Sequence, residues 1–220
     1  TQYNSVLHIK PTDNDASFTI STSDGAGDSA MYAVRDTIND FTDLPYYAPL
    51  GTIIKITGDE GQIDTDYYVK FDGNGTWVEC AAPGITTTID PTTMPHKLVR
   101  ATNNTFTLSQ CSWDLRKCGD DDTNPVPSFI GFAPNNITFY KNRFGILADE
   151  NIILSEAGGY FNFFSQTVAA NLATDYIDLA ATSNEVSVLK HAIPFNEELI
   201  LFSDLAAVQV RYHLEMQVLL

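Results

Sequence analysis

Short segments in which apolar and polar residues alternate, separated by turn signals, restrict this chain to a mainly β fold. In "DYYVKF", Tyr67, Val69 and Phe71 fall on one face of an extended strand. The following "DGNG" (72–75) offers glycines for positive φ angles, and "TWVEC" (76–80) continues as a second strand. This pattern predicts a β-hairpin, and related segments recur along the chain.

Other segments predict further strands and one helix. Alternation predicts strands at residues 17–22, 52–57 and 208–219, the last of them long and unbroken. Apolar residues recur at three- and four-residue spacing over 31–41, which predicts one short helix that begins near Ser29. Strands therefore dominate both halves of the chain.

A composition break and a weak repeat indicate how the chain is organised. In "APGITTTIDPTTMPHK" (82–97) Pro, Gly and Thr dominate and no periodicity holds, so we place a domain boundary there. Beyond it, "ENIILSE" (150–156) aligns with "ELILFSD" (198–204), and "NTFTLSQ" (104–110) is a weaker copy. The first two are predicted to be buried strands, and repeats of this spacing are typical of β-propeller blades.

The charge of the chain excludes a large class of functions. Twelve Lys and Arg residues stand against 28 Asp and Glu residues, which gives a net charge of −16. Most of the surface should therefore repel phosphate backbones, so a sequence-reading DNA-binding protein is excluded. An acidic surface still suits a wall past which a duplex must slide without adhering.

The cysteines and the termini give further expectations. Cys80, Cys111 and Cys118 are odd in number and lack CxxC spacing, which argues against a zinc ribbon and against a disulfide scaffold and favours packed thiols. We expect no membrane insertion, because no apolar run approaches a membrane span. The start "TQYNSVLHIK" has no initiating Met, so we expect a piece of a longer protein.

The segment "CGDDDTNPVPSFIG" (118–131) allows a cation site or a structural corner. The consecutive acids Asp120, Asp121 and Asp122 could ligate a hard cation, but they lack the ligand spacing and the distal Glu of an EF-hand loop. Turn chemistry accounts for every residue type, because glycine permits an unusual φ, Asp and Asn form Asx turns, and prolines keep the exit extended. We predict a structural corner, with no metal and no cofactor.

Catalysis finds little support in the sequence. There is no GxSxG elbow, no HExxH and no phosphate-binding glycine loop, and the four histidines are scattered singly. A carboxylate pair for glycoside hydrolysis stays open, because the fold sets the spacing of such a pair. In "GGYFNFF" (158–164), alternation would place aromatic rings on both faces, as a ligand-stacking platform or, our preferred interpretation, as an interblade or intersubunit seam.

The motifs together resemble a known family. These motifs are "CGDDDTNPVPSFIG", "ITFYKNRFGILADENIILSEAGGYFNFF" and "DYIDLAATSNEVSVLKHAIPFNEELILFSD". They resemble the nozzle proteins, or tail tubular proteins B, of short-tailed, podovirus-type phages. The resemblance extends back through "TINDFTDLPYYAPLGTIIKITGD", "DYYVKFDGNGTWVEC" and "TMPHKLVRA", from about Asp36 to Asp204, and fades after Asp204.

The resemblance implies a fold, a role and partners. The fold would be mainly β, with an inserted antiparallel β domain (1–96, with the one short helix) followed by partial β-propeller-like blades (97–220). Six copies would form a ring below the tail adaptor, tail tubular protein A, and enclose a channel through which double-stranded DNA passes without specific binding. The outer surface would bind tail fibres. The protein would be a non-enzymatic virion component, assembled in the bacterial host cytoplasm.

Within this interpretation, several residues are interface and scaffold candidates. They are Trp113, Asp120, Asp121, Asp122, Asn124, Pro127, Phe129, Asn142, Arg143, Phe144, Asn151, Tyr160, Phe161 and Phe163. In "KNRFG", Arg143 lies beside a turn and near several acids, and it could hold two segments together through bidentate hydrogen bonds. A carbohydrate-binding or carbohydrate-cleaving tail component is the alternative, and an acidic β-rich adhesion module is a third interpretation.

Overall fold

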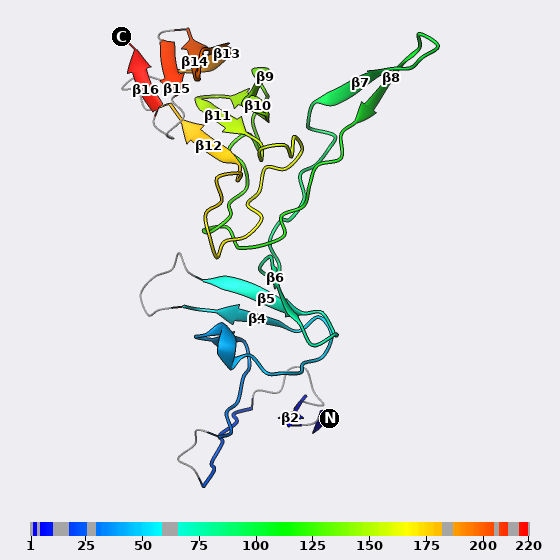
Figure 1. The fold of residues 1–220 in the computed structure, drawn as a ribbon, viewed down its shortest axis with the longest axis vertical. Helices are drawn as coiled ribbons and strands as arrows, with labels where there is room; N and C mark the ends of the chain where they lie inside the picture. Colours follow the sequence, from blue (N-terminus) through cyan, green and yellow to red (C-terminus); the bar gives the residue numbers. More distant parts are fainter. Residues whose placement is uncertain are drawn as a thin grey trace. The chain divides into compact units, whose positions relative to one another are not determined.

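A computed structural model describes residues 2–3, 5–10, 18–25, 30–58, 66–181, 187–204, 207–210 and 216–219. The chain divides into a first unit, Thr1–Gly84 with Cys118–Thr123, and a second unit, Ile85–Lys117 with Asn124–Leu220. The assignment of 1–96 and 97–220 to an inserted domain and a propeller-like region stays a prediction. Regular structure in the described residues is almost entirely β, which confirms the predicted fold class (Figure 1).

The strands are short and most pair antiparallel. They are β1 (Gln2–Tyr3), β2 (Val6–Leu7), β3 (Thr37–Ile38), β4 (Ile53–Ile56), β5 (Tyr67–Phe71), β6 (Trp77–Cys80), β7 (His96–Arg100), β8 (Phe106–Gln110), β9 (Asn136–Tyr140), β10 (Arg143–Ala148), β11 (Asn151–Leu154), β12 (Ile177–Ala180), β13 (Leu189–Phe195), β14 (Glu198–Ser203), β15 (Ala207–Val210) and β16 (Met216–Leu219).

The first unit contains the predicted hairpin. Its four-stranded sheet has the order β3-β4-β5-β6, and β5 and β6 form the hairpin with Phe71 opposite Trp77. Val69 and Phe71, which alternation places on one face of β5, are both buried. The indole N–H of Trp77 donates to the Pro45 carbonyl at 3.0 Å and fixes the proline-containing connector against the sheet. A separate pair, β1 and β2, completes the regular strands described in this unit.

The helix predicted to begin near Ser29 is wrong. Ser29 lies outside the described residues, residues 30–36 have no regular structure, β3 follows, and a single 3-10 turn, η1 (Phe41–Asp43), comes after it. The backbone of this segment bonds to β4 instead of to itself, since Lys55 N donates to Asp36 O and Thr57 N donates to Ile38 O, both at 2.9 Å. Tertiary pairing therefore overrides the helical spacing. The strand predicted for 17–22 is also absent from residues 18–22, which are described as irregular.

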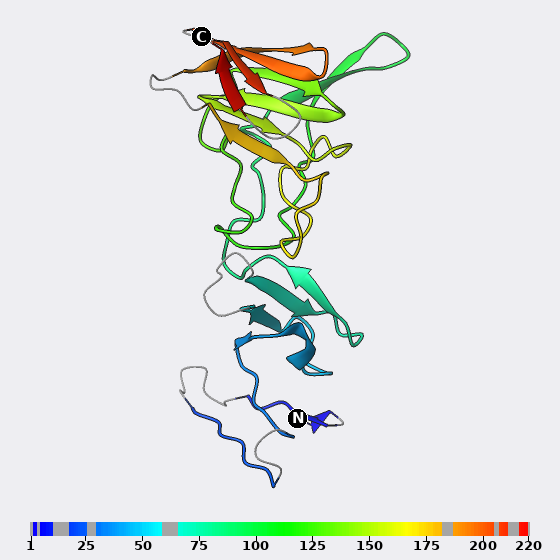
Figure 2. The same cartoon turned by 60° about the vertical axis from the view of Figure 1, so that its left-hand side comes forward.

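The second unit contains two four-stranded antiparallel sheets. Their orders are β12-β11-β10-β9 and β13-β14-β15-β16, and they lie face to face (Figure 2). Buried leucines and isoleucines of β10 and β11 pack against Leu189, Leu199 and Leu201 of β13 and β14. The Asn136 side-chain amide also donates to the Lys190 carbonyl at 2.9 Å and ties the edge strand β9 to β13.

The weak sequence repeat corresponds to strands, though not to equally buried ones. Residues 150–156 contain β11, and 198–204 contain β14, and each of these strands is the second in its sheet. Residues 104–110, the weaker copy, contain β8, which pairs with β7 in a two-stranded sheet and is exposed, so this copy differs in burial from the other two. The propeller-like arrangement of the sheets stays a prediction.

The unbroken strand predicted for 208–219 is also wrong. The chain forms β15 and β16, which pair antiparallel with Val208 opposite Val218, while 211–215 lie outside the described residues. Alternation continues across both strands, and the residues between them include neither Gly nor Pro, so the sequence carries no turn signal that separates two strands from one.

Candidate scaffold and interface residues

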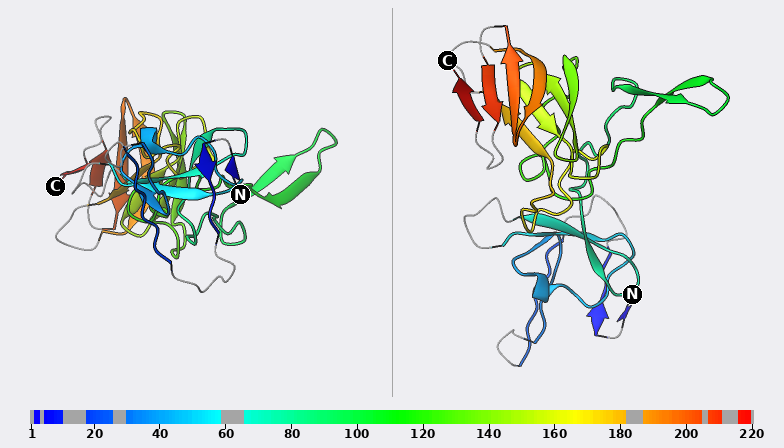
Figure 3. Two further views of the ribbon diagram at one scale, coloured as in Figure 1. Left: turned by 90° about the horizontal axis from the view of Figure 1, so that it is seen from below. Right: turned by 45° about the horizontal axis from the view of Figure 1, so that its top comes forward.

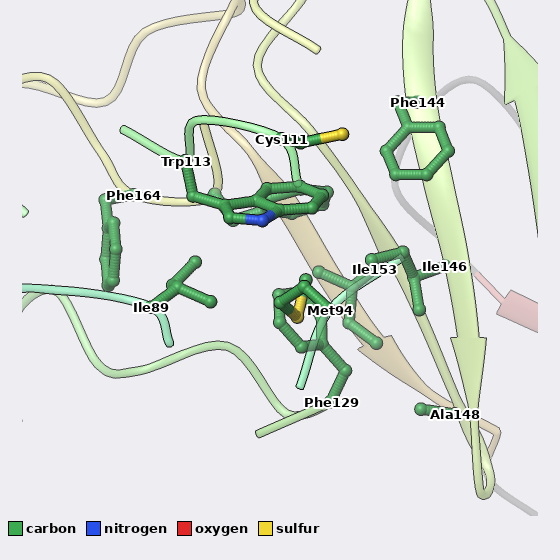
Figure 4. Close-up of a cluster of buried hydrophobic side chains, with 11 residues drawn as sticks. Ile89, Met94, Cys111, Trp113, Phe129, Phe144, Ile146, Ala148, Ile153 and Phe164 are labelled. Atoms are coloured by element: carbon green, nitrogen blue, oxygen red, sulfur yellow. The ribbon is translucent and has the colours of Figure 1, made fainter. Parts of the chain in front are cut away.

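Four of the candidates form the centre of an aromatic core in the second unit. The ring centroid of Trp113 lies 6.4 Å from that of Phe144 and 5.9 Å from that of Phe163, and Phe129 meets Phe163 edge-on at 5.1 Å. All four are buried. Figure 4 shows the Trp113 indole in the middle of the cluster, which also includes Met94. The edge-to-face contact between Phe129 and Phe163 stabilises the core in addition to the free energy gained by burying the rings.

Phe161 covers this core from outside. Its ring meets Trp113 edge-on at 5.4 Å and is itself partly exposed. The alternation predicted for 158–164 is wrong, because these residues form turns in place of a strand, and Phe163 and Phe164 are both buried. The segment therefore turns its two last rings inward and leaves Tyr160 and Phe161 at the surface.

Arg143 joins the start of β10 to two other segments. Its guanidinium donates from Nη1 to Ser155 O at 2.8 Å and from Nη2 to Ala173 O at 2.8 Å, and it also donates to the carbonyls of Thr174 and Asp175. The side chain is 7% exposed. Arg143 thus contacts several backbone acceptors, where the sequence led us to expect carboxylates.

Asn142 and Tyr160 meet at the hairpin between β9 and β10. Lys141 and Asn142 have φ angles of 45° and 60°, as a two-residue type I′ hairpin turn requires. The Tyr160 hydroxyl donates to the Asn142 side chain at 2.7 Å, and Gly158 N donates to Asn142 O at 2.8 Å. The aromatic segment is therefore fixed to this turn by polar contacts.

Asn124 forms a buried amide bridge at the exit from the acidic segment. Ser165 N donates to Asn124 Oδ1 at 3.0 Å, and Asn124 Nδ2 donates to Ser165 O at 3.3 Å. Close by, Pro127 is buried, and Ser128 N donates to the Asp178 carboxylate at 2.8 Å. These contacts hold residues 124–128 to segments that follow about forty to fifty positions later.

Asp120 closes the corner predicted for the acidic segment. One oxygen of its carboxylate accepts from Thr123 N at 3.0 Å, from Thr123 Oγ1 at 2.9 Å and from Asp122 N at 3.2 Å. Partial burial opposes ionisation of Asp120, but these hydrogen bonds and nearby Lys55 outweigh it and lower its pKa. Gly119 has the expected positive φ, 72°. The geometry is that of a turn.

The candidates are divided between the two units. Asp120, Asp121 and Asp122 belong to the first unit, whereas the remaining candidates belong to the second. Asp121 and Asp122 are exposed, and Asn151 begins β11 opposite Ala148 and Ala180. Among the described residues, no group of three or more His, Cys, Asp or Glu side chains is placed to hold a metal ion.

Sequence reasoning missed a set of buried polar residues beside Arg143. The Ser155 hydroxyl accepts from Phe144 N at 3.0 Å, and Asn162 donates to Glu156 at 2.9 Å while bonding the Phe164 backbone through both ends of its amide. Ser155 and Glu156 end the "ENIILSE" repeat, so the sequence did carry a signal for them. Asn162 gave no signal, because alternation placed it on one strand face together with the aromatic residues Tyr160 and Phe164.

The cysteines and the apolar segments were also the subject of predictions. Cys80, Cys111 and Cys118 are buried free thiols, which confirms the packed-thiol interpretation, and burial raises the pKa of Cys80. In the part of the chain that the structure describes, no helix has the length and apolarity needed to cross a membrane.

Comparison with known proteins agrees with the motifs. A family described as bacteriophage nozzle protein matches residues 1–213, which extends past Asp204, where the sequence resemblance fades. The tail tubular protein gp12 of Escherichia phage T7 is 38% identical over 199 residues, or 90% of this chain. The chain spans about a quarter of that relative's length, 25%. This chain therefore belongs to the bacteriophage nozzle protein family.

Proposed function

We propose that the complete protein forms a six-copy ring below the tail adaptor, tail tubular protein A, and encloses the channel for DNA ejection. Tail fibres bind its outer surface. The chain then acts by assembly and not by catalysis, inside a tail that is assembled in the bacterial host cytoplasm. The observation that carries the proposal is the family match over residues 1–213.

The charge of the chain supports the channel. Even if every Lys and Arg paired with a carboxylate, a net charge of −16 would remain. A wall of this sign repels phosphates, so passing DNA stays mobile and is not held by counterion release.

Binding to the adaptor–portal complex tests the proposal. The complete protein, incubated with the purified complex, should add a ring of density below the adaptor in electron micrographs. A short duplex should not be retained by these particles even at low salt, where electrostatic adhesion is strongest. Particles without added density contradict the proposed nozzle ring. Particles that retain the duplex tightly contradict the proposed acidic channel wall.

A glycan-binding tail component is the second candidate, and exposed aromatic rings favour it. Phe139, Tyr160 and Phe161 are all partly exposed, and the Phe139 and Tyr160 rings meet edge-on at 5.8 Å. Such rings can stack on sugars. This candidate predicts that the protein binds the host's surface polysaccharide and that Phe139→Ala abolishes the binding. A substitution of Tyr46, which is also exposed, is the control and should leave the binding unchanged. No binding by the wild-type protein removes it.

A further inference from the structure

The β7–β8 hairpin, residues 96–110, is an arm of the second unit. It points away from the two four-stranded sheets of that unit (Figure 3). Every residue of β7 is exposed, and Ser109 alone in β8 is half-buried. An isolated two-stranded hairpin is at best marginally stable in water. The arm therefore needs a surface to pack against.

One face of the arm is apolar. Leu98 lies directly opposite Leu108, and Arg100 lies opposite Phe106, so these four side chains share a face. Leu98, Phe106 and Leu108 are 64%, 61% and 67% exposed. The other face has Val99 opposite Thr107 and Lys97 opposite Ser109, which is more polar. Burial of the first face would supply most of the hydrophobic free energy.

The arm also differs in charge from the rest of the chain. No Asp or Glu occurs between Asp90 and Asp114, whereas the arm contains Lys97 and Arg100. The whole chain has a net charge of −16. A cationic arm on an acidic chain is complementary to the surface of another copy of the same chain.

A groove in the same unit has the chemistry to receive the arm. It has a volume of about 480 Å³. Val126, Ile130 and Phe132 line it and are 40%, 40% and 54% exposed. Asp90 also lines the groove and is exposed, and its carboxylate is oriented by hydrogen bonds from the backbone and the hydroxyl of Thr92. The groove is thus apolar with an acid at its edge.

The arm and the groove lie on different parts of one unit. Met94 lines the groove, whereas the arm begins at His96 and contributes no residue to the groove's described lining, so the arm starts beside the groove and is not part of it. A projection that fits a recess elsewhere on the same molecule gives a head-to-tail contact, which closes into a ring when the rotation permits. Each copy then offers an arm to one neighbour and a groove to the other.

We propose that the arm of one copy lies in the groove of the next. The Leu98–Leu108 face packs on Val126, Ile130 and Phe132, and Arg100 lies beside Asp90 of that copy. This inference rests on the proposed ring, and it assigns the contact that joins neighbouring copies.

Disulfide trapping in the complete protein tests the contact. Leu98→Cys and Ile130→Cys are combined in one chain, in which Cys80, Cys111 and Cys118 are buried, and the complete protein without the two substitutions is oxidised in parallel. Mild oxidation of preformed rings should give a ladder of linked copies on non-reducing gels. Thr107→Cys with Ile130→Cys is the matched control, because Thr107 lies on the opposite face of the arm. Mass photometry before oxidation records whether rings are present.

The outcomes separate this contact from the proposed function. A ladder from the first pair and none from the control supports the contact. Rings that form but give no ladder, or that give only an internal link within one chain, overturn the contact and leave the nozzle ring in place. Failure of the unmodified protein to form rings overturns the ring itself.

An assembly measurement gives a second, independent test. Leu98→Ser with Leu108→Ser should raise the concentration for half-assembly by about tenfold or more, as expected for the centre of an interface. Thr107→Ser should leave it unchanged. The monomers of the wild type, the Leu98→Ser/Leu108→Ser variant and the Thr107→Ser variant should unfold at the same temperature, because these side chains are exposed. Equal assembly by the three proteins contradicts the proposal.

Discussion

The buried guanidinium of Arg143 donates to the backbone carbonyl of Ser155 at 2.8 Å, across the hairpin partner strands β10 and β11. The same group donates to three consecutive carbonyls, those of Ala173, Thr174 and Asp175. A single side chain thus donates to backbone acceptors in two segments, and one of these acceptors belongs to the fully buried Ser155. We conclude that Arg143 fixes the loop before β12 onto the sheet.

Replacing Arg143 with Ala should destabilise the second unit by about 2–4 kcal/mol, since the carbonyl of buried Ser155 loses its donor and the contacts with residues 173–175 are lost. Arg143→Lys should recover only part of this, because an ammonium cannot reproduce the planar fork. Hydrogen exchange of residues 155 and 173–175 in the complete protein measures the effect. The control is Arg35→Ala, whose side chain is 81% exposed. Unchanged exchange in Arg143→Ala argues against the conclusion that Arg143 fixes the loop before β12. Unchanged ring assembly in this variant argues against the predicted role of Arg143 in contacts between copies.

Asn124→Asp should weaken the bridge to Ser165. Asn124 is fully buried, and the substitution places a carboxylate oxygen against the Ser165 carbonyl. We expect a loss of about 2–4 kcal/mol at neutral pH. Burial raises the folded-state pKa of the introduced acid above its unfolded value, so the loss should shrink as the pH falls through that pKa. Denaturant unfolding at several pH values checks this, with exposed Asn74→Asp as the neutral control.

Acidification should weaken the Asp120 corner. The folded-state pKa of Asp120 lies below its ordinary value of 3.8, so its contribution is present above that value and is lost as the pH falls through the folded-state pKa. Asp120→Asn should flatten this part of the stability profile, whereas Asp121→Asn, at an exposed neighbour, should not. Unfolding midpoints measured from about pH 2 to pH 6 decide between them. Parallel profiles for wild type and Asp120→Asn contradict the assignment.

Gly145→Ala should destabilise the sheet of β9 to β12. A Cβ at this position would lie 2.7 Å from Thr138 Cγ2 and 2.8 Å from Leu154 Cδ2, on the two strands that flank β10. We expect a cost of about 1–3 kcal/mol, as in other overpacked cores. Thermal unfolding measures it. Thr138→Ser should recover part of the loss by removing one contact, and Gly25→Ala, with open space around it, should be neutral. If Gly145→Ala unfolds at the wild-type temperature, the side chains of Thr138 and Leu154 do not pack closely against position 145.

The local chemistry of the sequence predicted part of this fold. Alternation and the "DGNG" turn identify the β5–β6 hairpin. Gly119 and the Asp and Asn residues after it predicted a corner, but Asp122 and Asn124 were the expected Asx residues, whereas Asp120 accepts the hydrogen bonds. The helix failed because the segment's hydrogen bonds go to β4, which no local pattern records. Met31 and Phe41, which would share the helix's apolar face, are both exposed.

The candidate site was less accessible to sequence reasoning. The resemblance to nozzle proteins selected Trp113, Phe144 and Phe163, which meet in the core. The partners of Arg143 and Asn124 are backbone groups far along the chain, and any residue type can supply a backbone carbonyl. Such contacts depend on the fold alone, so residue identities do not reveal them.

The most direct test of the account is mass photometry of the complete protein, alone and mixed with the adaptor–portal complex of its phage. We predict that the mass of the complex increases by six copies in one discrete step. A protein that remains monomeric and adds no mass to the complex would contradict the nozzle ring.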